Sequence, residues 1–355
     1  MRSPFTPQAL AAYLSTVHGA PVADARVTPL GGGRQGDKGY GYGVPLRVDY
    51  VLRGTPRRAV IETVRAGPFG HEHMADRAQS LLWAHGAFAR LPRHVSSLDV
   101  GAVRASGALV PLGNAEELFM LAEFVEGREY ADDLLRLRAG AALAPLDEAR
   151  CDALCDYLLE IHRVPGTDHG LYVRRIRDTV GHGECIFGVA DSYAGEEPLL
   201  RDIEARCVEW RWKLKRRAHR LRQVHGDFHP WNILFRAGAE FSVLDRSRGE
   251  WGEPADDVTC LALNYLFFSL QRSGRLEGAF ETLWRRFWER YLERSGDREL
   301  LEVAGLFLAF RGLVMANPLW YPALAPDVRR KMLGFVQRVL EEERFEPARA
   351  NDYCQ

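Results

Sequence analysis

The stretch His225-Gly226-Asp227-Phe228-His229-Pro230-Trp231-Asn232 is the most informative part of this chain. It has the spacing H-x-D-x-x-x-x-N, which places a carboxylate and an amide on one tight loop. A second acid, Asp245, follows the short apolar run 241–244, where a strand would end. Carboxylate and amide oxygens are hard ligands that suit magnesium, and a carboxylate can accept the proton of a hydroxyl group. The stretch therefore predicts a site for phosphoryl transfer, which depends mainly on an aligned hydroxyl, magnesium and fixed charges.

Each polar residue of this pattern has a predicted role. Asp227 would orient the acceptor hydroxyl and take its proton as the bond to phosphorus forms. Asn232 and Asp245 would bind magnesium. His225 is expected to brace the loop by hydrogen bonding, and Asp257, at the start of a later helix, is expected to cap that helix or brace the loop. The alternative, a plain polar turn before a strand, leaves the second Asp unexplained.

The composition argues against several classes of protein. The 355 residues, 46% of them hydrophobic, suffice for two domains or one bilobal unit. A net charge of -1 provides no global attraction to nucleic acid or anionic membranes, so nucleic acid is not an expected partner. No apolar stretch approaches the ~20 residues of a membrane span, and the start lacks a signal-peptide core, so a cytoplasmic location is expected. The six Cys include no CxxC pair, which argues against zinc or a disulfide framework.

The first third of the chain reads as a small sheet. A capped opening helix is predicted over 8–18, followed by seven glycines between 31 and 43. Strand-like runs follow at 46–52 and 59–64, and Arg53-Gly54-Thr55-Pro56 between them predicts a hairpin turn. A sheet built from this part would be antiparallel.

The pattern then changes to helices. A helix is predicted over 72–88, and two short strands are expected at 100–104 and 118–125. Beyond them almost only helical spacing recurs, with four helices expected after residue 257 and a frayed tail from 341. We therefore predict an α+β fold of two lobes. Residues 1–123 would form a small antiparallel-sheet N-lobe, and residues 124–355 a larger, mainly helical C-lobe with the catalytic loop.

These motifs resemble those of the aminoglycoside phosphotransferase and choline kinase family, small-molecule relatives of protein kinases. The resemblance covers nearly the whole chain. It is carried by 225–232, where Gly follows the His, and by Leu244-Asp245 together with 252–258, which is similar to the family's Gly-Asp-Pro-x-x-Asp-Leu. Weaker matches are the linker 123–127 and the segment 158–162. The resemblance implies a bilobal, protein-kinase-like fold with nucleotide in the cleft between the lobes.

The resemblance also implies an activity. It is that of an ATP- and Mg²⁺-dependent phosphotransferase, which transfers the γ-phosphate to a hydroxyl group of a small molecule. Backbone groups of Glu123 and Val125 would pair with the edge of the purine, so GTP is an alternative to ATP. The alternative for this linker is an ordinary strand-to-helix connection that does not bind nucleotide. Aminoglycoside, amino-alcohol, sugar and nucleoside-like acceptors all stay open. No pattern in the sequence indicates an oligomeric state.

The chain departs from the family where kinases carry a lysine on the third strand. The corresponding run Val60-Ile61-Glu62-Thr63 has none. Lys38, in the glycine-rich loop with Gly36 and Gly39, could reach the phosphates while the loop amides form an anion nest; a floppy hairpin is the alternative for this loop. Arg65 is the second candidate, because alternation along a strand would turn it inward with Thr63. Lys38 is preferred narrowly, since a compact ammonium fits between phosphate oxygens more easily than a guanidinium; a solvated Lys38 is the alternative.

The missing lysine also supports a different class of protein. A pseudokinase would bind nucleotide and act as a regulatory module without transferring phosphate. The intact set of Asp227, Asn232 and Asp245 argues against this interpretation, since such a protein has no need of a base and two metal ligands.

Two further segments attract attention. The basic run 211–222 would suit a kinase of RNA or protein, but apolar residues from Trp210 to Leu221 form one stripe, so a solvated helix face is preferred. The segment His182-Gly183-Glu184-Cys185, with Asp191 nearby, matches no familiar metal spacing. A substrate-facing or structural loop is preferred there.

Overall fold

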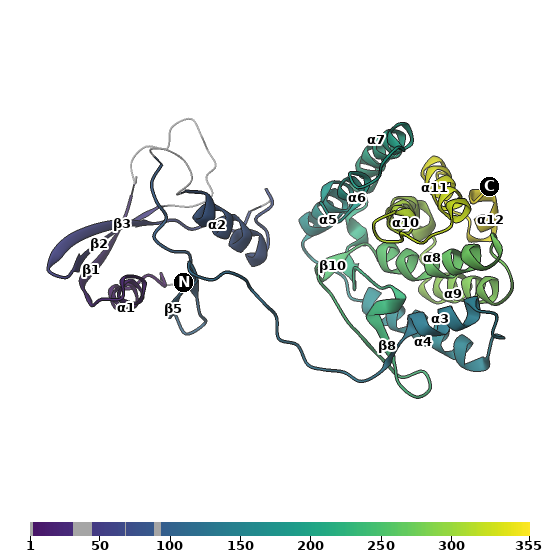
Figure 1. The fold of residues 1–355 in the computed structure, drawn as a ribbon, viewed down its shortest axis with the longest axis horizontal. Coiled ribbons are helices and arrows are strands. Elements are labelled where there is room, and N and C mark those ends of the chain that lie inside the picture. The colour runs from purple at the N-terminus through teal and green to yellow at the C-terminus, as the bar shows by residue number, and fades with distance from the viewer. Residues whose placement is uncertain (1–2, 31–44, 68, 89–93) are drawn as a thin grey trace. The chain divides into compact units, whose positions relative to one another are not determined.

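The computed structural model describes residues 3–30, 45–67, 69–88 and 94–355. The chain divides into two compact units, Met1–Ala122 and Glu123–Gln355 (Figure 1). The first unit contains an antiparallel sheet, and the second is mainly helical. The predicted α+β class is therefore confirmed.

A three-stranded antiparallel sheet forms the centre of the first unit, in the order β1-β2-β3. Its strands are β1 Val22–Pro29, β2 Leu46–Leu52 and β3 Thr55–Ile61. The turn between β2 and β3 is shorter than predicted, because Arg53 (φ 51°) and Gly54 (φ 78°) both adopt left-handed conformations. This two-residue turn matches the twist of the strands and lets them pair up to Thr55, so β3 begins and ends earlier than the predicted 59–64.

The opening helix, α1 Pro7–His18, is confirmed and packs on the sheet. The Thr6 side chain accepts a hydrogen bond from Ala9 N at 3.2 Å, and Gly19 (φ 58°) ends the helix in the left-handed conformation. Leu10 and Leu14 of α1 are buried in a small core. The cap and the apolar spacing of the sequence thus correctly located both ends of α1.

The remaining described residues of the first unit include one helix and one hairpin. Helix α2 Met74–Phe88 begins two residues later than predicted. Strand β4 Gly101–Val103 pairs with β5 Leu109–Pro111. The predicted strand at 118–125 is wrong: these residues form no strand, although apolar side chains such as Phe119 and Phe124 give them a strand-like composition. A strand needs a hydrogen-bonding neighbour, and none of the strands that the structure describes pairs with this segment.

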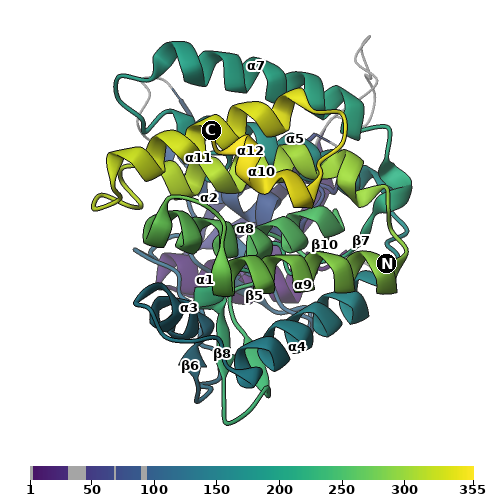
Figure 2. The ribbon, with the colours of Figure 1, turned by 90° about the vertical axis from the view of Figure 1, so that its right-hand side faces the viewer.

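The second unit is built from helices packed around one core. Its helices are α3 Tyr130–Arg138, α4 Pro145–His162, α5 His169–Gly181, α6 Ile186–Ala190, α7 Glu197–Leu214, α8 Pro254–Ser273, α9 Gly278–Ser295, α10 Leu300–Ala316, α11 Pro326–Glu341 and α12 Ala350–Tyr353. The four long helices α8 to α11 confirm the prediction for this part of the chain. Figure 2 shows α8 and α9 lying side by side, with α4 on the other side of α9.

Short strands in this unit carry the residues of interest. Strands β6 Arg128–Glu129, β8 Ile233–Phe235 and β9 Phe241–Val243 form one antiparallel sheet in the order β6-β8-β9. Strand β7 Arg222–Gln223 pairs with β10 Trp251–Gly252. The loop between β7 and β8 contains the stretch 225–232.

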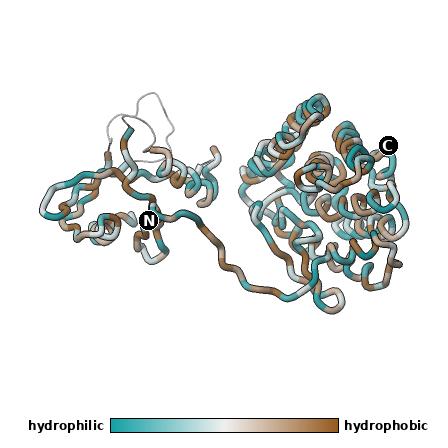
Figure 3. Tube along the Cα trace, viewed as in Figure 1, coloured by the Kyte–Doolittle hydropathy of each residue, from teal (hydrophilic) through white to brown (hydrophobic). Residues whose placement is uncertain are grey.

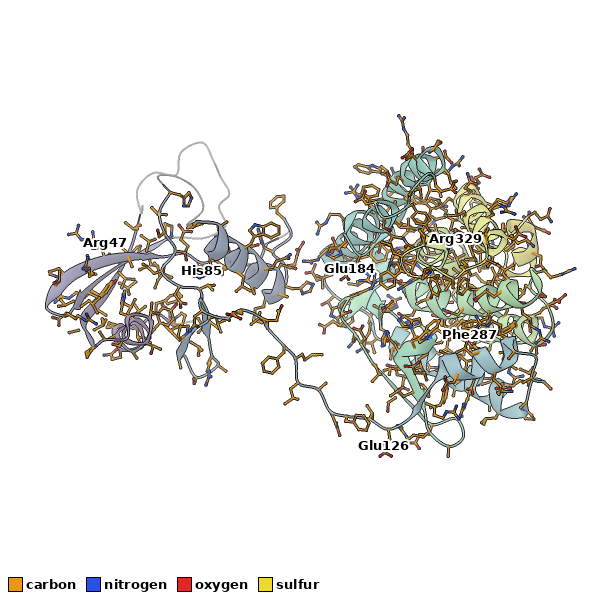
Figure 4. The ribbon with its side chains drawn as sticks, viewed as in Figure 1. Arg47, His85, Glu126, Glu184, Phe287 and Arg329 are labelled. Carbon is orange, nitrogen blue, oxygen red and sulfur yellow. The ribbon has the colours of Figure 1, made fainter. Side chains whose placement is uncertain are left out.

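Helices α8 and α10 form the centre of the core. Nearly all of their side chains are buried, including apolar residues on every face. Figure 3 shows hydrophobic residues along both helices, and Figure 4 labels Phe287 of α9, whose ring contacts Tyr265 of α8 edge-on at 6.2 Å between centroids. A helix that is apolar all round needs neighbours on all sides, which explains the position of α8 and α10.

Two predictions for the second unit are wrong. The tail does not fray: it forms a 3₁₀ turn at Pro347–Arg349 and α12, and the buried rings of Phe345 and Tyr353 stack at 5.4 Å between centroids. The prediction relied on the Pro, Glu and Arg content of the tail and gave no weight to these two aromatic residues, whose burial holds the tail in place. The apolar stripe of the basic run also stops early, because α7 ends at Leu214 and Ala218 lies in a separate 3₁₀ turn.

The helices described by the structure include none that is both long and apolar enough to span a bilayer. All six cysteines are buried and free.

Candidate active site

A buried aspartate holds the loop that carries the sequence motif. The backbone N–H groups of His225 and Gly226 donate to the two carboxylate oxygens of Asp257, both at 2.7 Å. His162 Nε2 adds a third hydrogen bond at 3.1 Å. Burial alone would raise the pKa of Asp257, but the hydrogen bond from His162 and the neighbouring histidines lower it overall. Asp257 therefore braces the loop, while Glu253, whose side chain accepts from Ala255 N, caps α8.

Glycine is required at position 226 by its conformation and its surroundings. Gly226 has a φ of 89°, a region that side-chain-bearing residues rarely adopt. A Cβ atom here would lie 3.1 Å from Arg175 Nη2 and 3.3 Å from the Cβ of Arg248. The missing side chain leaves room for Arg175, whose Nη2 donates to the Gly226 carbonyl oxygen at 3.2 Å. The same oxygen accepts from Arg311 Nη2 at 2.9 Å.

His225 is buried and its ring faces the loop. Its Nδ1 accepts a hydrogen bond from the backbone N–H of Asp227 at 3.3 Å, and the ring contacts Phe228 edge-on. Its Nε2 is buried without a hydrogen-bond partner among the described residues. These contacts join His225 to the backbone of the loop, and none of those described joins its ring to the Asp227 carboxylate.

Two arginines and a histidine surround the Asp227 carboxylate. Its Oδ1 accepts from Arg311 Nη1 at 2.5 Å and lies 3.9 Å from Arg248 Nε, while His229 Nε2 lies 3.7 Å from Oδ2. Burial raises the pKa of Asp227, but Arg311, Arg248 and His229 outweigh burial and lower it overall. Asp227 is therefore ionised at neutral pH, with Oδ1 engaged and Oδ2 more accessible to a new partner.

Asn232 and Asp245 lie at the same end of a strand pair. Strands β8 and β9 pair Ile233 with Val243, and the ladder continues with Leu244 N donating to Asn232 O at 2.8 Å. Asp245 is the next residue. The Asn232 side chain points back to the loop, where its Nδ2 donates to the Asp227 carbonyl oxygen at 3.0 Å. The strand pair β8-β9 and the loop before it thus carry the predicted base, Asp227, and the two predicted metal ligands, Asn232 and Asp245.

The backbone of Asp245 is in an unusual conformation. Its φ is 54°, a left-handed region that costs a residue other than Gly on the order of 1–3 kcal/mol. Its side chain is exposed, and Oδ1 accepts from Ser247 N at 3.2 Å. Strain of this kind persists at functional sites because the surroundings enforce it. The conformation is consistent with a functional requirement for the carboxylate at this point.

The oxygens of Asn232 and Asp245 fit magnesium by their chemistry. Both are hard donors, and magnesium commonly binds one or two such protein groups and keeps water or phosphate oxygens elsewhere. Within the described ranges no group of three or more His, Cys, Asp or Glu side chains could enclose a metal ion. The donor set therefore suits a cation shared with a phosphorylated ligand better than a cation in a protein cage.

Four residues of this site were not singled out by sequence reasoning. They are Arg311, Asp256, Arg248 and Arg175. Arg311 had a visible signal, because it is a lone cation in the apolar run 303–316. Asp256 was part of the matched motif at 252–258, but its role depends on helices distant in the sequence.

The structure describes only some of the residues that are predicted to bind the nucleotide. Lys38, Gly36 and Gly39 lie outside the described residues. Arg65 is exposed and lies four residues beyond the end of β3 at Ile61, so the alternation that would turn it inward does not apply, and that reasoning was wrong. Glu123 and Val125 begin the second unit in a segment without assigned strand.

The segment 182–185 borders the site. Cys185 precedes α6 and is buried, and its Sγ accepts from Arg248 Nη1 at 3.4 Å. Burial raises the pKa of this thiol. His182 Nδ1 accepts from Glu184 N, and Glu184 itself is exposed at the surface of the second unit, near α5 and α6 (Figure 4).

Comparison with known proteins gives a family match. A family model described as the phosphotransferase enzyme family matches residues 48–295. A comparison with curated proteins finds no match.

Several solved structures resemble this one at low identity. The amicoumacin kinase hAmiN in complex with AMP-PNP, Ca²⁺ and Ami has 14% identity, and the match covers 91% of this chain and 91% of that chain, with a TM-score of 0.42. A thermostable mutant of the aminoglycoside phosphotransferase APH(4)-Ia in its apo form has 15% identity. The match covers 93% of this chain and 98% of that chain, with a TM-score of 0.38. A glucosamine kinase in complex with glucosamine, ADP and inorganic phosphate has 20% identity. The match covers 60% of this chain and 57% of that chain, with a TM-score of 0.32. All three TM-scores are low.

Proposed function

Because this chain belongs to the phosphotransferase enzyme family, we propose that it transfers the γ-phosphate of ATP to a hydroxyl group of a small molecule with the help of Mg²⁺. The observation that carries the proposal is the ionised Asp227 on a braced loop, with Asn232 and Asp245 gathered beside it by one strand pair. A hydroxyl acceptor needs such a carboxylate.

Asp227 would bind and orient the acceptor. Its Oδ2 would accept a hydrogen bond from the hydroxyl group and then its proton as the bond to phosphorus forms. A carboxylate with a lowered pKa is a weak base. It is sufficient here, because phosphoryl transfer depends mainly on positioning and on stabilising charge.

Asn232 and Asp245 would hold magnesium through their side-chain oxygens. When bound, magnesium would supply the positive charge that neutralises charge developing on the phosphate. The hydrogen bond from Asn232 Nδ2 to the Asp227 carbonyl leaves the amide oxygen of Asn232 as its metal-binding atom. The same hydrogen bond joins the metal-binding residue to the loop of the base.

Further cations would balance the charge of the triphosphate. Lys38, with the amides of Gly36 and Gly39, is the first candidate, and Arg65 is the second. The purine would pair with backbone groups of Glu123 and Val125, which accommodates GTP as well as ATP.

The charges near Asp227 favour a neutral hydroxylated acceptor, such as a sugar or nucleoside, over a polycation. Arg248 lies 3.9 Å from the carboxylate and stacks on Phe310 at 5.1 Å from the ring centroid. Among the described residues Asp227 is its only ion-pair partner, and no carboxylate lies within hydrogen-bonding distance of it. Asp256, another acid nearby, is neutralised by Arg175 and Arg311.

The proposal is tested by measuring ADP release with ATP and Mg²⁺ over a panel of neutral sugars, nucleosides, amino alcohols and aminoglycosides. We expect acceptor-dependent turnover with a neutral acceptor. Binding of ATP without transfer to any acceptor would instead favour the pseudokinase alternative, which the lysine-free run 60–63 supports.

A further inference from the structure

Arg311 is a charged residue in the interior of an apolar helix. It lies in the last two turns of α10, where its neighbours in sequence are apolar or Gly from Val303 to Ala316. The residue is only 5% exposed. Removing a guanidinium from water costs several kcal/mol, and an apolar residue of similar size would often be as stable in its place. Its presence here is therefore explained poorly by stability alone.

The guanidinium group of Arg311 contacts three acceptors around the loop. Nη1 donates to Asp227 Oδ1 at 2.5 Å, and Nη2 donates to Gly226 O at 2.9 Å and to Asp256 Oδ1 at 2.8 Å. A planar fork is needed to reach acceptors on both sides of the loop. Arg311 thus joins the carboxylate of Asp227 to the backbone of the same loop.

Asp256 fixes the position of Arg311. Asp256 is 1% exposed, and its second oxygen accepts from Arg175 Nη2 at 2.6 Å. Arg175 also donates to the Gly226 carbonyl oxygen, at 3.2 Å, and to the carbonyl oxygen of Arg248, at 2.6 Å. Asp256 and Gly226 therefore hold two guanidinium groups side by side, and Arg311 is the one that reaches Asp227.

We propose that Arg311 is a positioning residue for phosphoryl transfer: it holds Asp227 Oδ1 so that Oδ2 is presented to the acceptor hydroxyl. This inference rests on the proposed function. The other basic side chains near the carboxylate are Arg248, at 3.9 Å, and His229, at 3.7 Å, and both lie beyond hydrogen-bonding distance. Without Arg311 the side chain of Asp227 has no short contact among the residues that the structure describes. Its rotamer would then be less restricted, and misplacement by about 1 Å can cost on the order of 10²-fold in rate.

The test compares two substitutions of Arg311 with a matched control. Arg311→Met removes the guanidinium, and Arg311→Lys keeps the charge but cannot reach all three acceptors. The control is Arg220→Met. Arg220 is also 5% exposed and pairs with the three carboxylates of Glu253, Asp297 and Glu299 in the same unit, but it does not contact Asp227. Both Met variants therefore break a buried pair.

The kinetic readout is kcat, KM for the acceptor, ATP affinity and thermal stability for each protein. We expect Arg311→Met to lower kcat on the order of 10²-fold with little change in ATP affinity, and Arg311→Lys to be intermediate. Arg220→Met should lose stability and keep most of its kcat per folded molecule. If Arg311→Met fails to fold, Arg311→Lys and Asp256→Asn, which loosens the anchor of Arg311, provide the same comparison. A kcat in the Arg311 variants equal to that of Arg220→Met would overturn the inference.

Crystal structures of the wild type and of Arg311→Lys separate this inference from the proposed function. We expect the Asp227 carboxylate to move while the loop backbone, held by Asp257, keeps its place. A carboxylate that stays in place contradicts the positioning role, whatever the acceptor. A wild type that transfers phosphate to no acceptor contradicts the proposed function instead.

Discussion

Gly226 donates its backbone N–H to Asp257 at 2.7 Å, across 31 positions of the sequence. Through this contact the first turn of α8 fixes the loop that carries Asp227. Asp257 is completely buried, and each of its hydrogen bonds replaces water that the carboxylate lost on folding. The geometry of the base therefore depends on a residue that has no contact with the acceptor in the proposed reaction.

Replacing Asp257 with Ala is expected to lower the free energy of unfolding by about 3–5 kcal/mol, because it leaves buried partners unpaired. The partners are the N–H groups of His225 and Gly226 and the ring of His162. Urea unfolding measures the loss. Asp202→Ala is the control, since the ion pair of Asp202 with Arg206 is exposed and should contribute below about 1 kcal/mol. Equal losses in the two variants would show that Asp257 does not brace the loop.

Replacing Asp245 with Ala should abolish the part of the thermal stabilisation by ATP that depends on magnesium. The reason is that the proposed metal site loses its only protein carboxylate. Asn232→Ala should weaken the same effect less, because a neutral amide attracts the ion less strongly than a carboxylate. Thermal shifts with ATP, with and without Mg²⁺, measure both effects. An unchanged shift in Asp245→Ala would place the metal elsewhere.

The missing strand lysine predicts that another cation binds the phosphates. Lys38 is the only lysine before Lys213, so we expect Lys38→Ala to weaken ATP binding more than Arg65→Ala does. Calorimetric titration of the two variants side by side measures the difference. A loss confined to Arg65→Ala would assign the role to that residue. If both variants bind ATP like the wild type, neither residue replaces the lysine, and the pseudokinase alternative gains support.

Acid should remove the stabilising contribution of Glu299. Burial acts to raise its pKa, but hydrogen bonds from His219 and Arg217, together with the charge of Arg220, lower it from 4.5 to about 2. A group whose pKa is lower in the folded state stabilises the protein fully above its ordinary pKa and loses this effect as the pH falls through the lowered value. Glu299→Gln should therefore be less stable than the wild type at neutral pH, and the difference should shrink as the pH falls from 4.5 towards 2. A difference that does not change with pH would contradict this account of Glu299.

Local chemistry made part of this structure predictable. The residues that start and stop helix α1, Thr6 and Gly19, lie directly before and after it in the sequence, so its bounds could be predicted. The spacing within 225–232 and the apolar run before Asp245 describe a loop and a strand end that are close in sequence. Short-range patterns of this kind are set by hydrogen bonds between near neighbours.

Other features depend on contacts that the sequence does not display. Arg311 and Asp227 are 84 positions apart, and only the packing of α10 beside the loop brings them together. The strand β1 was missed because its side chains are mostly exposed and a bulge between Ala23 and Arg26 interrupts the alternation. The apolar run 118–125 looked like a strand, but strand formation is decided by a partner and not by composition.

The most direct test of the proposed reaction is phosphate transfer by Asp227→Asn. The amide has the size of the carboxylate but cannot accept the hydroxyl proton, so kcat should fall on the order of 10²–10⁴-fold while ATP affinity stays close to that of the wild type. The measurement is turnover with ATP, Mg²⁺ and the best acceptor of the panel, with calorimetry for ATP binding. Wild-type turnover in Asp227→Asn would contradict the assignment of Asp227 as the base on which the proposed function depends.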